Sequence, residues 1–146
     1  MLRLTKRSNR HKRRGAAMLE LALLLPVLLL LTGGIIDFAR CAYYYIAVSD
    51  AAAAGAKFAS FHPVTPTTLN LWNTLTRQAV YDSLSGVPGF DNSRMNVTNP
   101  IVISDGTTDL QRVRVSVQYS FHTIVSWPMI PNSVIIRRSV EMRIVR

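Results

Sequence analysis

The chain has 146 residues, of which 49% are hydrophobic, and a formal net charge of +9 at pH 7; this length suffices for one compact domain but not for two substantial ones. Seven of the seventeen basic residues precede Gly15, and the ten that follow are almost balanced by eight acidic residues. Because a nucleic-acid-binding protein carries its positive charge across its folded surface, this distribution argues against nucleic acid as a partner and indicates a membrane-orientation signal.

Residues 1–15 form a basic tail that we interpret as a cytoplasmic leader. The cations closest to the apolar segment that follows are Arg10, Lys12, Arg13 and Arg14. Positive residues beside a membrane span keep their side of the span in the cytoplasm. The N-terminus is therefore predicted to be cytoplasmic, and everything after Ile36 is predicted to lie outside.

Residues 16–36 are an apolar run whose single charged residue is Glu20. As a helix this run would rise about 32 Å, which matches the hydrocarbon core of a bilayer and predicts a transmembrane helix. A cleavable secretory signal has a shorter apolar region, and Arg40 directly before Cys41 does not fit a lipidation box. A charged carboxylate at membrane depth is unfavourable by about 2.5 kcal/mol or more, so Glu20 must be protonated, partnered, or able to reach the surface.

Residues 37–61 are free of proline and rich in alanine, which predicts that the same helix continues outside the membrane. A face of small residues permits close packing, either on the chain's own head or on another subunit; it comprises Ala47, Ala51, Ala54 and Gly55. The three tyrosines 43–45 are interpreted as a collar at the membrane surface. Pro26 removes one helical hydrogen bond and predicts a kink.

Residues 62–146 are predicted to form a small head. A second helix is expected after Thr67 or Thr68, which would cap it, and its apolar side would comprise Leu69, Trp72, Leu75 and Ala79. Strict alternation predicts strands at 111–121 and 133–146, the latter with Arg138 on its apolar side, and residues 96–104 are expected to form a third strand. The expected fold class is therefore α+β: a long N-terminal transmembrane and amphipathic helix packed on a small antiparallel β-sheet, with one additional short helix.

Catalytic motifs are missing from the sequence, because its three histidines are isolated, its single cysteine offers no metal cluster, and it has no phosphate-binding glycine loop. We therefore expect no enzymatic activity and no cofactor. Oxygen ligands for calcium stand in two loops, at Asp91, Asn92, Asp105 and Asp109. Turn formation explains these residues more simply, so no metal site is predicted.

The N-terminal motif resembles the processing and assembly site of type IV pilins and pseudopilins. In both, a basic leader ends in glycine, here Gly15, and a glutamate, here Glu20, stands fifth in the chain that begins at Ala16. The stretch from Arg13 to Ser60 is most similar to the TadE-like family, whose members are minor pilins or pseudopilins of tight-adherence (Tad/Flp) pilus systems. Leu21 follows the glutamate here, where family members commonly have an aromatic residue.

The resemblance implies cleavage between Gly15 and Ala16 by a prepilin peptidase, and an assembly role for Glu20. It also implies a single-pass protein of the bacterial inner membrane, with a periplasmic head and with other pilus subunits and the assembly platform as partners. The expected function is that of a non-enzymatic minor pilin or pseudopilin. The alternative is an uncleaved signal-anchored membrane protein whose head binds a protein partner.

Overall fold

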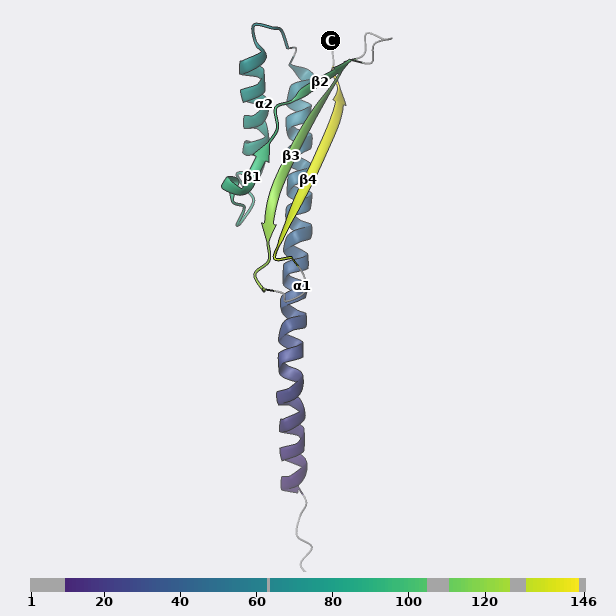
Figure 1. Ribbon diagram of the computed structural model, residues 1–146, viewed down its shortest axis with the longest axis vertical. Coiled ribbons are helices and arrows are strands. Elements are labelled where there is room, and N and C mark those ends of the chain that lie inside the picture. The colour runs from purple at the N-terminus through teal and green to yellow at the C-terminus, as the bar shows by residue number, and fades with distance from the viewer. Residues whose placement is uncertain (1–9, 63, 105–110, 127–130, 145–146) are drawn as a thin grey trace, which may run out of the picture.

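The computed structural model describes residues 10–62, 64–104, 111–126 and 131–144, and the side chains from Gly15 onward. Its first element, α1 (Arg10–Phe61), is a single helix of 52 residues that continues through Pro26 (Figure 1). The predicted helix is confirmed, but it begins before Ala16, so that Gly15 lies within it rather than ahead of it. It ends where His62 Nδ1 lies 2.8 Å from the carbonyl oxygen of Phe58, just before the sequence reaches Pro63.

The second helix, α2 (Leu69–Leu84), packs against α1. Thr68 occupies its N-cap position, but its hydroxyl does not cap the helix; it accepts a hydrogen bond of 3.0 Å from the Thr65 amide instead. The predicted apolar face is wrong in part, because Leu69 and Leu75 are more than two-fifths exposed. The buried face shares Trp72 with the predicted one and comprises Trp72, Thr76, Val80 and Leu84.

A four-stranded antiparallel sheet forms the rest of the head. It consists of β1 (Met95–Val97), β2 (Ile101–Ser104), β3 (Gln111–His122) and β4 (Ser133–Arg143), and a short 3-10 helix, η1 (Asn92–Arg94), precedes β1. Strand β3 is central: β4 pairs along its whole length, while β1 and β2 pair with its two halves on the other edge. The head is therefore the α+β structure that the sequence predicted.

The strand expected at 96–104 is divided into β1 and β2. Val97 pairs with Val117, and Ile101 pairs with Arg114, so four steps along this edge correspond to three steps along β3. The extra residue reverses which side chains face inward, as in a β-bulge. Odd-numbered residues face the core in β1, whereas Val102 lies opposite the buried Val113 in β2.

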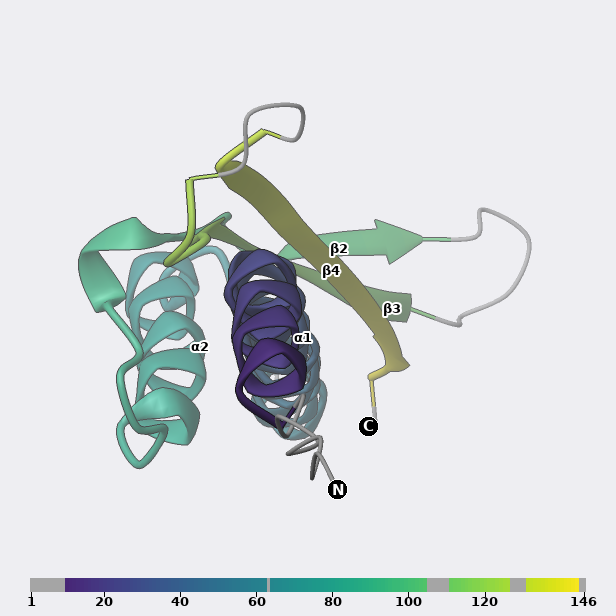
Figure 2. The ribbon, with the colours of Figure 1, turned by 90° about the horizontal axis from the view of Figure 1, so that it is seen from below.

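The core lies where α1 is enclosed between the inner face of the sheet and α2 (Figure 2). Alternate residues of β3 supply its centre, namely Val113, Val115, Val117, Tyr119 and Phe121. Small residues of α1 meet them, namely Ala51, Ala52, Ala56 and Ala59, with Val48. Of the small face predicted from the sequence, Ala51 and Gly55 are buried in the chain's own head, whereas Ala47 and Ala54 are half-buried.

The remaining half of α1 extends beyond the head as an isolated rod (Figure 1). Every residue from Gly15 to Thr32 is exposed, and Gly33 is the first that is not. These eighteen residues would rise about 27 Å as a helix, close to the thickness of a bilayer core. In the described part of the chain, α1 is the one helix long and apolar enough to cross a membrane.

Candidate functional site: the exposed segment of α1 and its junction with the head

The two residues of the predicted processing site, Gly15 and Ala16, are exposed on α1. A Cβ atom added at Gly15 would meet nothing within 4 Å, so the peptide bond between Gly15 and Ala16 is open on its outer side. Both residues are helical, whereas a peptide bond enters a protease in extended form. Glycine weakens a helix by about 1 kcal/mol relative to alanine, which favours local opening at this point. Arg10, Lys12, Arg13 and Arg14 belong to the first turns of α1, and their side chains are outside the described part.

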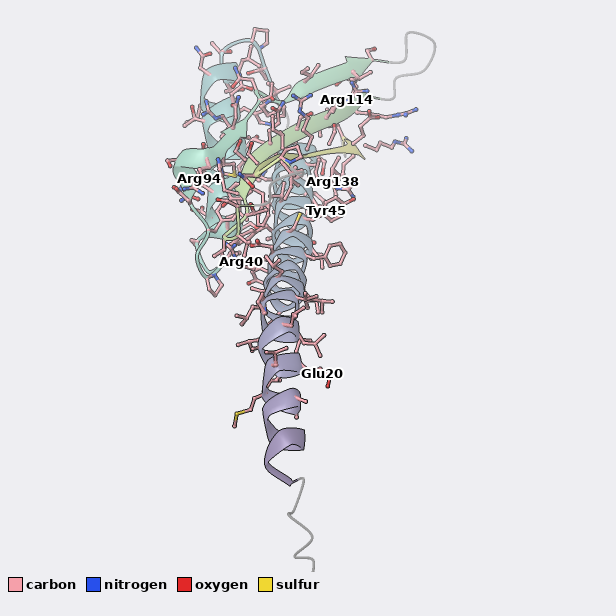
Figure 3. The ribbon with its side chains drawn as sticks, turned by 60° about the horizontal axis from the view of Figure 1, so that its bottom comes forward. Glu20, Arg40, Tyr45, Arg94, Arg114 and Arg138 are labelled. Atoms are coloured by element: carbon pink, nitrogen blue, oxygen red, sulfur yellow. The ribbon has the colours of Figure 1, made fainter. Side chains whose placement is uncertain are left out.

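Glu20 is exposed on this segment and points away from α1, far from the labelled residues of the head (Figure 3). Among the residues that the structure describes, none forms a hydrogen bond or ion pair with its carboxylate. Ala16 lies four residues earlier, one helical turn away on the same side. An amino group created at Ala16 would therefore lie within reach of a carboxylate at position 20, in the same chain or a neighbouring one.

Asp37 marks the junction between the exposed segment and the head. Its carboxylate is 4% exposed and accepts hydrogen bonds from the backbone amides of Ile124, at 2.9 Å, and Val125, at 3.1 Å. These amides belong to the connection that follows β3. A carboxylate that receives two backbone donors is well stabilised despite its burial, and here it fixes the end of the sheet to α1.

Two neighbours of Asp37 complete this junction. Arg40 Nη1 lies 3.3 Å from Asp37 Oδ1, and its guanidinium carbon lies 5.5 Å from the centre of the Phe121 ring. One turn before Asp37, a Cβ atom added at Gly33 would come within 2.9 Å of Val125 Cγ2. Because this approach is too close for a side chain, glycine lets the connection lie directly on the helix.

The predicted collar of three tyrosines is wrong for Tyr44. Its side chain is 5% exposed and lies inside the head, where its hydroxyl donates a hydrogen bond of 3.0 Å to the carbonyl oxygen of Gly89. Its ring lies within 6 Å of the rings of Phe90 and Tyr119. Tyr43 and Tyr45 remain nearly half exposed. The three side chains diverge because successive residues of a helix are about 100° apart.

Arg138 lies on the inner, apolar side of β4, as the sequence predicted, where it pairs across the strands with Val117. Its guanidinium carbon lies 4.7 Å from the centre of the Tyr45 ring, and its Nη2 donates to Ser49 Oγ at 3.3 Å. The inward arginine thus spans the gap between the sheet and α1 and reaches the edge of the head (Figure 3). A cation over an aromatic face contributes about 0.5–1 kcal/mol at an exposed site.

Asp91, one residue of the calcium hypothesis, has a structural role. Asp91 accepts hydrogen bonds from the hydroxyl and amide of Ser93, which lower the pKa of its carboxyl, and this caps η1. Burial raises the pKa of the Tyr119 phenol.

Asp105 and Asp109 of the calcium hypothesis lie outside the described residues. In the described part, no group of three metal-ligating side chains comes together.

Sequence reasoning found the exposed segment but missed the junction. In the sequence, Asp37 and Arg40 are simply the first two charged residues after the apolar run. A signal was present, because a carboxylate placed three residues before an arginine and four residues after Gly33 combines an ion pair with a close-packing position. The acceptor role itself could not be predicted, since the donors are 87 and 88 residues away along the chain.

The comparison with protein families found one match that bears directly on this segment. The model of the TadE-like protein family matches residues 15–57, from the proposed processing site through most of the outer half of α1. This match is consistent with the family that the sequence resembles, and it suggests a Tad-pilus-related protein similar to minor pilins, for which α1 supplies one candidate membrane span. Comparisons with curated proteins and with solved structures found no significant match.

Proposed function

We propose that this chain is a non-enzymatic minor pilin or pseudopilin that serves the assembly of a Tad/Flp pilus. The observation that carries this proposal is the coincidence of the family match with an exposed apolar helix. The family match begins at Gly15, and Glu20 is the only charged residue among the exposed residues 15–32. The family match also supports a non-enzymatic role, since a pilus subunit acts through its contacts.

The proposed layout follows the exposure of α1. Residues 1–15 are a cytoplasmic leader that is removed, and residues 16–36 span the bacterial inner membrane. Residues 37–61 continue the helix into the periplasm, where residues 62–146 form the head. Gly33 already contacts the head. The last turn of the span, residues 33–36, therefore lies at the periplasmic surface of the inner membrane rather than in its hydrocarbon core.

Processing would occur at the cytoplasmic surface. The cations at 10–14 hold this part of the chain against anionic lipid headgroups, and Gly15 presents a peptide bond with no side chain on its N-terminal side. A prepilin peptidase, an aspartyl protease of the membrane, is the proposed processing enzyme. Cleavage removes the leader and leaves a positively charged amine on Ala16.

The new amine gives Glu20 its partner. In the low dielectric near the membrane an ion pair is much stronger than in water, provided that both groups are well placed. Pairing between Glu20 of one subunit and the amine of another would set their axial positions during assembly. The partners proposed for the mature chain are therefore other pilus subunits and the assembly platform.

Two measurements test this function: mass spectrometry of the mature protein, and co-purification of two variants with pilus components. Mass spectrometry of the mature protein should find Ala16 as its first residue, while an intact leader would favour the uncleaved alternative. Glu20→Leu should leave insertion and cleavage unchanged, because a more apolar span inserts at least as well, but should abolish co-purification with pilus components. Asp50→Leu, which removes an exposed carboxylate further along α1, is the matched control and should retain co-purification.

The possible failures of this test have separate meanings. Normal piliation in the Glu20→Leu strain would remove this residue from assembly. Loss of cleavage in that variant would instead move its role to recognition by the peptidase. A protein that is cleaved normally and yet never co-purifies with pilus components, even with Glu20 present, would contradict the proposed function as a whole.

A further inference from the structure

The end of the head that faces the exposed half of α1 is apolar. Large hydrophobic side chains gather there, each at least 45% exposed, and we call this set the apolar rim; it comprises Ile35, Ile36, Phe38, Ile124, Val134 and Ile135. The connection between β3 and β4 lies at this end in Figure 1. Residues 123–132 carry no charged side chain in the sequence. Exposed apolar surface of this extent marks a site of contact.

The apolar rim lies at a defined height along α1. A bilayer core of about 30 Å corresponds to about twenty helical residues, so a span that begins at Ala16 ends near Ile35. The β3–β4 connection touches α1 at this height, because Val125 packs on Gly33 and its amide donates to Asp37. We infer that the apolar rim inserts into the outer interface of the bilayer and that the head is thereby fixed to the membrane by a second contact.

A lipid surface explains the rim better than a protein partner does. Ile35 and Ile36 are adjacent in a helix and so point about 100° apart, and the connection covers a further side of α1, that of Asp37. Apolar groups therefore point outward in several directions around the helix. A protein partner would cover one of these directions, whereas a bilayer surrounds the helix and is continuous with the apolar segment below.

The polar groups at the junction are arranged in keeping with this position. Asp37, the carboxylate at this height, is buried and bonded to backbone amides rather than exposed to lipid. Arg40 stands one turn after the rim's Ile36 in α1, keeps about a third of its side chain exposed, and places its guanidinium beside the Asp37 carboxylate at this height. A guanidinium at that height suits the lipid phosphate groups, as expected for a cation beside a membrane interface.

A cavity of about 310 Å³ opens in the same surface, between α1 and the start of β4. Its lining is mainly apolar and includes Phe38, Cys41, Phe121 and Val134. Water forms few hydrogen bonds in such an apolar cavity. The acyl chains of lipids form no hydrogen bonds, so they can enter the cavity without this loss. The cavity thus adds to the apolar area that insertion removes from water.

The inference rests on the membrane span proposed above, so the experiment measures both. The full-length protein with Cys41→Ser is reconstituted in phosphatidylethanolamine–phosphatidylglycerol vesicles, and single cysteines carry an environment-sensitive fluorophore. Ile124→Cys and Ser126→Cys report on the connection, and both replaced residues are exposed. Leu24→Cys reports on the span, and Thr74→Cys, on the exposed side of α2, is the matched control in the head.

Nitroxide-labelled lipids then locate each fluorophore. Shallow nitroxides should quench the labels at 124 and 126 and blue-shift their emission, and should leave the label at 74 unchanged. Deep nitroxides should quench the label at 24. Labels at 124 and 126 that behave like the label at 74 would overturn the inference while the span at 24 stands. An unquenched label at 24 would overturn both the span and the inference.

Discussion

At the residue scale, two charged side chains connect α1 to the rest of the head by polar contacts that apolar side chains could not form. Asp37 and Arg138 each lie on the inner side of the head, and each joins α1 to the sheet by polar contacts. Arg138 was recognisable as an exception to the alternation of β4, so the sequence predicted its position. Its contacts with Ser49 and Tyr45 were beyond prediction, because they depend on how the sheet crosses the helix.

Replacement of Asp37 by alanine should destabilise the head. Two backbone amides would lose their acceptor in a buried place, and a loss of about 2–4 kcal/mol in the free energy of unfolding is expected from unsatisfied groups of this kind. Urea denaturation of the full-length protein in detergent, followed by Trp fluorescence, measures this loss. Asp50→Ala removes an exposed carboxylate from the same helix and should leave the midpoint unchanged. Equal midpoints for the two variants would mean that Asp37 does not hold the head on α1.

At the element scale, periodicity predicted most of the secondary structure and failed where packing decides. The continuous apolar and alanine-rich run predicted α1, and the alternation at 111–121 predicted β3 with its buried side. The α2 face was mispredicted because Leu69 and Leu75 are more apolar than Thr76, although Thr76 is the fully buried residue. The edge strand was predicted as continuous because an extra residue in one strand leaves no clear mark on the sequence.

The crossing of α1 and α2 gives a prediction about Gly55. An added Cβ atom would lie 2.5 Å from Val80 Cγ2 and 3.3 Å from Val115 Cγ1, so Gly55→Ala forces α1 away from both α2 and the sheet. Overpacking of this kind destabilises a core by about 1–3 kcal/mol. That loss outweighs the gain of about 1 kcal/mol in helix propensity.

The control for this variant is Gly86→Ala, because a Cβ atom there would meet nothing within 4 Å. Its unfolding midpoint should stay near that of the parent protein, whereas the midpoint for Gly55→Ala should fall in the same urea titration. A midpoint that rises for Gly55→Ala would show that the helices separate without loss and that helix propensity dominates at this position.

At the scale of the whole molecule, charge and exposure divide the chain into three zones along one axis. Basic residues precede Gly15, an exposed apolar rod extends to Thr32, and a mixed polar head packs on two sides of the outer half of α1 (Figure 2). The head is small, and much of its core is the outer half of α1 itself. Because the head cannot bury its sheet without this helix, its orientation in the membrane follows from that of α1.

This axis predicts the orientation of the protein. Seven cations precede the proposed span, whereas Arg40 is the first cation after it, and this asymmetry predicts a cytoplasmic N-terminus. A periplasm-dependent reporter fused after Arg146 should therefore be active, and a cytoplasm-dependent reporter at the same place should be inactive. Replacing Lys12, Arg13 and Arg14 by glutamine should transfer part of the activity to the cytoplasmic reporter, because the asymmetry falls. Cytoplasmic activity of the unaltered fusion would contradict the proposed topology, since the head and the pilus components would then lie on opposite sides of the membrane.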